Sequence, residues 1–277
     1  MTDGTGARVR EDETTRFWLQ KDKPDLATRV AALHKQRRLL LESEPKKKVE
    51  ITRAAVAALF VSGQGLEVGA GPRPFPLPDG ASCMYGDIRD GEALKAYFGG
   101  SAVEKNGFID AQTFSGVSDN AFDFVISAHV IEHLENPIGS IRNAIRVLRP
   151  GGRHILVVPD RRHTFDRHRS PTPLSHLLTD DEDGGASTRL ADYKDFILNV
   201  GVKSFNNIPP VDIDAEAERL SNNRHDIHFH CWNTTEFRSM LDAISAEIGF
   251  RMIGHVLASN ENIFVLEKDL ISRFPSK

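Results

Sequence analysis

Strand-like and helix-like patterns alternate between residues 65 and 159, and this alternation limits the fold more than any other feature. Short apolar runs recur there, several of them closed by glycine or aspartate, with helix-forming stretches between them. Because parallel strands need long crossover connections, which are usually helices, the alternation predicts a mostly parallel sheet with helices on both faces. The expected strands cover residues 66–68, 82–85, 107–111, 122–127 and 154–158.

Capping patterns indicate where the helices of this segment begin and end. Asp90 precedes a helix expected over residues 92–98, and Asn136 followed by Pro137 is typical of the start of another. The two glycines at 151–152 are expected to end that second helix.

The C-terminal part predicts one more helix and an antiparallel hairpin. Asn233 followed by Glu236 forms a capping-box pattern, and apolar residues then recur at helical spacing. The last two expected strands, 251–257 and 262–267, are joined by only four residues. So short a link makes them antiparallel, so the sheet should carry an antiparallel edge hairpin.

We expect three parts along the chain. An N-terminal tail with helices covers residues 1–60, one α/β domain covers 61–268, and a tail covers 269–277. Within the first part, residues 1–13 have the composition of a disordered segment. Residues 160–231 interrupt the alternation after the fifth strand, and a segment of that length is typical of a lid or an acceptor-binding insertion.

Two N-terminal helices are expected, over residues 26–41 and 52–60. Apolar residues of the first fall near one face, while lysine and arginine fill the other. That apolar face could pack on a partner, so a homo-oligomer is left open. Its members are Leu26, Val30, Leu33, Leu40 and Leu41.

Composition excludes several classes of protein. The 277 residues carry a net charge of −4 with a pI near 6.3, which argues against a dedicated nucleic-acid binder. Two cysteines cannot form a disulfide framework. The polar N-terminus does not resemble a signal peptide, and the longest apolar run, residues 54–61, is far shorter than the ~20 residues of a membrane span. A cytoplasmic protein without a membrane span is expected.

A glycine-rich turn follows the first expected strand, where residues 66–71 read Leu-Glu-Val-Gly-Ala-Gly. Glycines at this place let the backbone approach a ligand closely. A dinucleotide fingerprint would need glycine or alanine where Pro74 stands, and prolines at 72, 74, 76 and 78 prevent a helix directly after the turn. A nicotinamide cofactor is therefore disfavoured.

Acidic residues stand at the ends of three successive expected strands. Glu67 suits a ligand with an ammonium group, and Asp87, 20 residues later, stands where an acid can accept ribose hydroxyls. Asp110 could accept from an adenine amine. Each acid alone could be a solvated loop residue or a helix cap, but the three together beside a glycine turn favour a nucleoside-containing ligand.

Several motifs belong to one pattern: residues 67–71, Asp87, Asp110, 122–127, 132–134 and 147–152. With them the chain resembles the class I S-adenosylmethionine-dependent methyltransferases. Through residues 73–78, 129–133 and 158–167 it is also similar to bacterial methyltransferase-domain proteins that accompany glycosyltransferases in polysaccharide synthesis. The resemblance implies a Rossmann-like methyltransferase fold, an S-adenosylmethionine cofactor, and O-methylation of a small-molecule or glycan acceptor, most simply a sugar or glycan precursor.

The resemblance also implies roles for single residues. The methionine part of the cofactor would lie against the glycine turn, the ribose and adenine at the next two strand ends, and the sulfonium just past the fourth strand. One departure is Arg73, which stands where the family usually has a third glycine. The implied cofactor residues are Glu67, Gly69, Ala70, Gly71, Asp87, Ile88, Asp110, Ala111, Ala128 and His129.

Methylation of an alcohol requires removal of its proton, commonly by histidine or a carboxylate. His129 stands next to the expected sulfonium position, and His163 lies in the expected lid. His133 is the third candidate base, although a structural hydrogen bond at a helix start is the favoured explanation for it.

Polar residues of the insertion are candidates for holding the acceptor. We interpret Asp160, Arg161, His228 and His230 as substrate residues. His228 and His230 are two residues apart and would share one face of an expected strand, a spacing compatible with a metal. A wall of the acceptor pocket explains them too, and we assign no metal. Arginines at 161, 162, 167 and 169 either bind an anionic group of the substrate or pair with nearby aspartates.

The sequence thus predicts a methyltransferase. A non-catalytic binding or scaffold module on the same fold is the alternative, because prolines follow the glycine turn and no base stands out.

Overall fold

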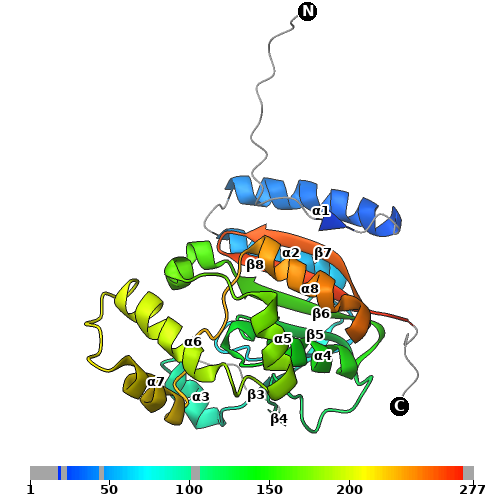
Figure 1. The fold of residues 1–277 in the computed structure, drawn as a ribbon. Coiled ribbons are helices and arrows are strands. Elements are labelled where there is room, and N and C mark those ends of the chain that lie inside the picture. The colour runs from blue at the N-terminus through cyan, green and yellow to red at the C-terminus, as the bar shows by residue number, and fades with distance from the viewer. Residues whose placement is uncertain (1–17, 20–23, 44–46, 101–106, 271–277) are drawn as a thin grey trace, which may run out of the picture.

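An eight-stranded mixed sheet forms the centre of the molecule in the computed structural model, which describes residues 18–19, 24–43, 47–100 and 107–270 (Figure 1). The strand order is β4-β3-β2-β5-β6-β8-β7-β1. The strands are β1 (Trp18–Leu19), β2 (Gln64–Val68), β3 (Ser82–Asp87), β4 (Gly107–Phe108), β5 (Phe122–Ala128), β6 (Leu148–Pro159), β7 (Phe250–Ala258) and β8 (Glu261–Lys268).

Strands β4, β3, β2, β5 and β6 are parallel, and β8 runs antiparallel to both β6 and β7. The mostly parallel α/β sheet with its C-terminal antiparallel hairpin is therefore confirmed. The hairpin does not end the sheet, because the two-residue strand β1 pairs with β7 outside it. Strand order reverses between β2 and β5, and open α/β sheets bind ligands at the carboxyl ends of the strands beside such a reversal.

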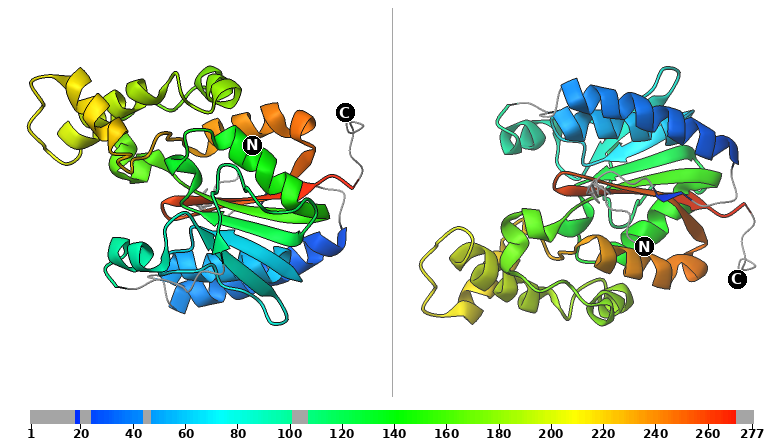
Figure 2. Two further views of the ribbon diagram at one scale, coloured as in Figure 1. Left: turned by 90° about the horizontal axis from the view of Figure 1, so that it is seen from below. Right: turned by 90° about the horizontal axis from the view of Figure 1, so that it is seen from above.

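Helices cover both faces of the sheet (Figure 2). On one face α2 (Lys48–Phe60) packs against inward residues of the central strands, and α1 (Pro24–Ser43) lies outside it. On the other face α4 (Pro137–Val147) and α8 (Thr234–Ile248) form the larger core. Side chains of a strand alternate between faces, which explains why Phe124 lies in the first core and Val125 in the second.

The expected helix starts are confirmed by their capping bonds. Asp90 accepts from the Ala93 N–H at the start of α3 (Gly91–Tyr97), and Asn136 accepts from the Gly139 N–H at the start of α4. Asn233 forms the expected capping box of α8.

Two local expectations are wrong. Helix α4 ends at Val147 rather than at the glycines 151–152, because Leu148 is already extended and pairs with β5. Strand β4 is shorter than residues 107–111, since the chain turns at Asp110. In α1, Leu33 packs against the core and Leu40 is exposed, while Arg37 is buried and donates to Thr52 Oγ1.

Residues 160–231 form a helical insertion with a small core of its own, projecting beyond the sheet (Figure 2). No strand occurs in it, only an isolated bridge between Asp160 and Trp232. Its elements are η4 (Arg161–His163), η5 (Phe165–His168), α5 (Leu174–Asp183), α6 (Arg189–Asp195), the π-helix η6 (Phe196–Val202) and α7 (Ile213–Asn222).

The expected disorder of residues 1–13 lies outside the described residues, and the three-part division of the chain stays a prediction. No helix in the described parts is long and apolar enough to cross a bilayer.

Candidate active site

The turn after β2 brings bare backbone to the carboxyl edge of the sheet. Gly69 has φ +67° and Gly71 has φ +56°, a region that residues with a side chain rarely adopt. A β-carbon on Gly69 would lie 2.6 Å from Val130 Cγ2, and one on Gly71 would lie 2.8 Å from the Phe98 ring. Both positions therefore require glycine. No helix follows the turn before β3, as the prolines predicted.

Glu67 is fully buried under this turn. Both of its carboxylate oxygens accept from the Phe75 N–H, at 3.0 and 3.1 Å. Burial raises the pKa of Glu67 to about 7, against the lowering effects of that hydrogen bond and of Arg53. The side chain thus fastens the proline-rich segment to the sheet, and its contact with a ligand ammonium group stays a prediction.

The acids of the next two strands lie at the same edge, as expected. The register pairs Val68 with Gly86, and Asp87 with Phe108, so β2, β3 and β4 end side by side. Asp87 Oδ1 accepts from the Arg89 N–H at 2.8 Å, and Asp110 Oδ1 accepts from the Gln112 N–H at 2.7 Å. These bonds hold both carboxylates at the turns after their strands.

These residues fit S-adenosylmethionine. The Gly69–Gly71 turn lies at the carboxyl end of β2, where the methionine part would lie, and carboxylates at the next two strand ends suit hydroxyl and amine donors. Ile88 is half exposed beside Asp87, and Ala111 is buried beside Asp110. Ala128 ends β5 and His129 follows it, and each residue's contact with the cofactor stays a prediction.

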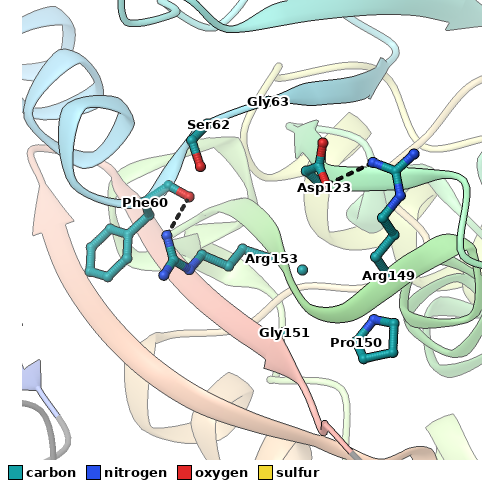
Figure 3. Close-up of a pocket in the computed structure, with 9 residues that line it drawn as sticks. Phe60, Ser62, Gly63, Asp123, Arg149, Pro150, Gly151 and Arg153 are labelled. Atoms are coloured by element: carbon teal, nitrogen blue, oxygen red, sulfur yellow. Dashed lines mark hydrogen bonds and ion pairs between the residues drawn. The ribbon is translucent and has the colours of Figure 1, made fainter.

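A pocket of about 390 Å³ opens at the opposite edge, around the amino ends of β2 and β5 (Figure 3). Arg149 there pairs with Asp123 at 2.7 Å, and Arg153 donates to the Phe60 carbonyl at 3.1 Å. Because the fold places its ligand edge at the carboxyl ends, this pocket is not part of the candidate site.

His129 lies between two carboxylates. Its Nε2 lies 2.8 Å from Glu261 Oε2, its Nδ1 lies 3.5 Å from Glu132 Oε1, and Arg53 holds Glu261 through two hydrogen bonds. Burial lowers the pKa of His129, but Glu132 and Glu261 outweigh it and raise the pKa to about 9. With both ring nitrogens facing carboxylates, His129 is an imidazolium at neutral pH and is poorly suited to accept a proton.

A network around Asp226 fastens the insertion to the cofactor edge. Asp226 accepts from Tyr97 Oη at 2.7 Å and from Arg89 Nη2 at 3.0 Å, and its Oδ1 lies 2.7 Å from His133 Nδ1. Burial opposes ionisation of Asp226, but these partners hold its pKa well below the usual range. His133 therefore has a structural hydrogen bond, which was the alternative to its role as a base.

Most of the arginines considered in the insertion contact protein groups. This favours pairing with nearby aspartates over binding of an anionic group of the substrate. Arg162 binds buried Asp160 through two side-chain bonds, and Arg169 contacts Asp166 and the carbonyl of His228. Arg161 donates to the Arg169 carbonyl.

The two histidines assigned to the substrate do not share a strand face, because residues 225–230 form no strand. The backbone of this segment bonds elsewhere: the Phe229 N–H donates to the Glu132 carbonyl, and Arg169 donates to the Phe229 carbonyl. His228 consequently faces Asp166, at 2.6 Å, while fully buried His230 contacts the carbonyl of Glu135. His163, in contrast, is exposed.

The sequence did not indicate a role for Glu132, whose carboxylate lies among the rings of His129, His133 and His228. Glu132 is 1% exposed, and neither of its side-chain oxygens has a hydrogen-bond partner among the described residues. Burial raises its pKa, but the rings of His129, His133 and His228 outweigh this and lower it. The motif Glu132-His133 was visible in the sequence. Its partner His228 lies too far along the chain for spacing to reveal it.

Parallel strands in this order, a glycine turn and acids at successive strand ends form a Rossmann-like arrangement, as the resemblance to S-adenosylmethionine-dependent methyltransferases implied. Residues 93–156 match a family model described as a methyltransferase domain, from α3 into the middle of β6. This match supports a methyltransferase that uses S-adenosylmethionine.

No curated protein matches the chain significantly. Among solved structures, a possible histamine N-methyltransferase from Thermotoga maritima is 16% identical with a TM-score of 0.44, covering 84% of this chain and 98% of its own. The CurJ carbon methyltransferase is 15% identical with a TM-score of 0.40, covering 85% of this chain and 70% of its own. The trans-methyltransferase CalH, in complex with S-adenosylhomocysteine, is 16% identical with a TM-score of 0.43, covering 80% of this chain and 55% of its own.

Proposed function

We propose that the protein transfers the methyl group of S-adenosylmethionine to a hydroxyl group of a sugar or glycan precursor. The observation that carries this proposal is the set of polar side chains between the carboxyl edge of the sheet and the insertion, residues 160–231. Arg89, Tyr97, His133 and Asp226 meet there and join the two through hydrogen bonds. An acceptor bound at such a junction meets polar side chains, both donors and a carboxylate, which suits several hydroxyl groups better than an apolar substrate.

In this proposal Gly69, Gly71, Asp87 and Asp110 hold the cofactor, which supplies an electrophilic methyl group on its sulfonium. The chain orients the acceptor oxygen in line with that methyl group, and positioning of this kind contributes ~7–11 kcal/mol to lowering a barrier. Asp160, Arg161, His228 and His230 stay candidates for the acceptor side.

In the proposed reaction, His163 accepts the proton of the acceptor hydroxyl group. Of the three histidines considered as bases, His129 and His133 each have a ring nitrogen held by a carboxylate, whereas His163 is exposed at the start of the insertion. Histidine is a common general base for the proton of a hydroxyl group.

The test combines a transfer assay with a variant. Labelled S-adenosylmethionine is incubated with the protein and a panel of sugar nucleotides and lipid-linked glycans, and the product is examined by NMR for a methyl ether. The His163→Gln variant is expected to lower kcat at least tenfold and to leave cofactor affinity unchanged. A methylated nitrogen or carbon would contradict the proposed acceptor.

A non-catalytic binding module remains the second candidate, favoured by the closure of the glycine turn by Glu67 and Phe75. Cofactor binding without turnover on every acceptor would support it, and any methylated product would exclude it.

A further inference from the structure

The insertion and the sheet enclose a carboxylate whose oxygens accept no hydrogen bond from any described residue. Glu132 belongs to η3 (Ile131–His133), directly after β5, and its backbone carbonyl accepts from the Phe229 N–H at 2.7 Å. Its side chain is buried, with 1% of the residue exposed. An ionised carboxylate in such a place is costly unless positive groups compensate it, and His129, 3.5 Å away, is one such group beside Glu132 Oε1.

Imidazole rings surround this carboxylate. Ligand atoms of Glu132, His133 and His228 all lie within 4.8 Å of one another. The rings of His133 and His228 are perpendicular, with their centroids 4.6 Å apart. His129 approaches from a third side, with Nδ1 3.5 Å from Glu132 Oε1. One carboxylate and two imidazoles therefore converge on one point between elements far apart in the sequence.

A second carboxylate orients each of the two rings from outside. His133 Nδ1 lies 2.7 Å from Asp226 Oδ1, and His228 Nδ1 lies 2.6 Å from Asp166 Oδ2. A ring that donates from Nδ1 to a carboxylate carries its lone pair on Nε2. Metal-binding histidines almost always have such an outer partner, which fixes the tautomer and strengthens the ligand.

We propose that Glu132, His133 and His228 bind a divalent transition-metal cation. Imidazole and carboxylate donors suit Zn²⁺, Co²⁺ and Mn²⁺, whereas Mg²⁺ and Ca²⁺ prefer oxygen alone. Three protein ligands leave coordination positions open, as in catalytic rather than structural sites. The site adjoins the end of β5, where an acceptor oxygen would complete it. This replaces the interpretation of the sequence alone, in which no metal was assigned.

A second cluster of similar composition serves as a comparison. His176, Asp180 and His230 also gather within 4.8 Å, but Asp180 already accepts from Thr188 Oγ1, and His176 Nε2 lies 3.2 Å from Asp192. There His176 Nε2 lies 3.4 Å from Asp180 and 3.2 Å from Asp192, so its ring nitrogen is shared between two carboxylates as an ion pair instead of facing a ligand site. We therefore place the cation at Glu132 and not there.

The test uses the full-length protein, stripped with a chelator and titrated with Co²⁺ while visible absorption is recorded. One Co²⁺ per chain should bind with ligand-field bands, and Zn²⁺ but not millimolar Mg²⁺ should displace it. Glu132→Gln and His133→Gln should each weaken Co²⁺ binding at least 100-fold. The matched control His176→Gln in the second cluster should leave binding unchanged.

Asp166→Asn keeps all three ligands and tests the site by a route that does not depend on Glu132 variants folding. It should weaken Co²⁺ binding 10- to 100-fold, the usual cost of losing an outer partner. Absence of Co²⁺ binding to folded wild-type protein would overturn the proposal, as would loss of binding in His176→Gln alone.

The proposal does not rest on the proposed acceptor. S-adenosylhomocysteine binding is measured by calorimetry on the same samples. Cofactor binding without Co²⁺ binding overturns only the metal site, whereas Co²⁺ binding without cofactor binding overturns only the proposed function.

Discussion

At the residue scale, Asp87 and Glu67 are two acids at one sheet edge with opposite surroundings. Asp87 ends β3 beside Arg89, while Glu67 is sealed under the glycine turn and bonded to one backbone N–H. Their positions in the sequence predict the same kind of role for both, as ligand-binding acids. The two acids differ in their surroundings, because the segment that contains Phe75 covers Glu67 and its N–H donates to the carboxylate.

The Asp87→Ala change tests the ribose position. Cofactor binding should weaken by about 1–3 kcal/mol, the usual cost of removing one side of a charged hydrogen bond. Calorimetry with S-adenosylhomocysteine measures the effect, and Asp119→Asn, whose exposed carboxylate pairs with Arg146, is the matched control. Equal affinities of Asp87→Ala and wild type would remove Asp87 from the site.

Glu67→Gln tests the buried carboxyl group through pH. Because the folded-state pKa is raised to about 7, from 4.5, the stability contributed by Glu67 is full below pH 4.5 and is lost as pH rises through about 7. The loss is on the order of 2–4 kcal/mol. The Glu67→Gln variant would keep an oxygen for the Phe75 N–H and carry no charge.

The variant should accordingly lose less stability than wild type between pH 4.5 and about 8, and it should melt higher than wild type at the upper end of that range. Thermal unfolding followed by circular dichroism at several pH values gives the comparison. Parallel curves for the two proteins would show that Glu67 does not titrate in this range.

At the element scale, the sequence predicted those helix starts and strands that depend on neighbouring residues. The capping side chains of α3, α4 and α8 and the strand–helix alternation were all readable, because each depends on residues within a few positions. The end of α4, the short β4 and the irregular segment 225–230 were not, because pairing with β5 and bonds from Arg169 and Glu132 decide them.

The Asn233 capping box offers a test of one element. Asn233→Ala removes the acceptor for two N–H groups at the start of α8 and should destabilise the protein by about 0.5–2 kcal/mol. Urea unfolding measures the change. Asp242→Ala, at an exposed position of the same helix, should shift the midpoint little, and equal effects of the two variants would argue against the capping box as a stabilising feature.

Asp226→Asn tests how the insertion is held. The change weakens the contacts to Arg89 and His133 at once, so the insertion should open more often and residues 160–231 should be cleaved several-fold faster in limited trypsin digestion. Asp214→Asn, which loses only an exposed pair with Lys194, is the control. Unchanged cleavage in Asp226→Asn would show that other contacts hold the insertion.

At the scale of the whole molecule, the sheet separates two cores and presents one functional edge. Cluster residues on α2 lie on one face and those on α4 and α8 on the other, while the insertion adds a third, smaller core beyond the edge (Figures 1 and 2). The place of the acids at the carboxyl edge of the sheet was predictable because strand ends mark it in the sequence. The insertion side was not, since Glu132 and His228 meet only through the tertiary fold.

Binding of S-adenosylhomocysteine to the purified full-length protein, measured by isothermal calorimetry, tests the account most directly. The account predicts one site per chain and a higher melting temperature at saturation, because a ligand that binds only the folded state stabilises it. No heat and no change in melting temperature at saturating concentration would contradict it, and would mean that the turn fastened by Glu67 and Phe75 closes the cofactor edge.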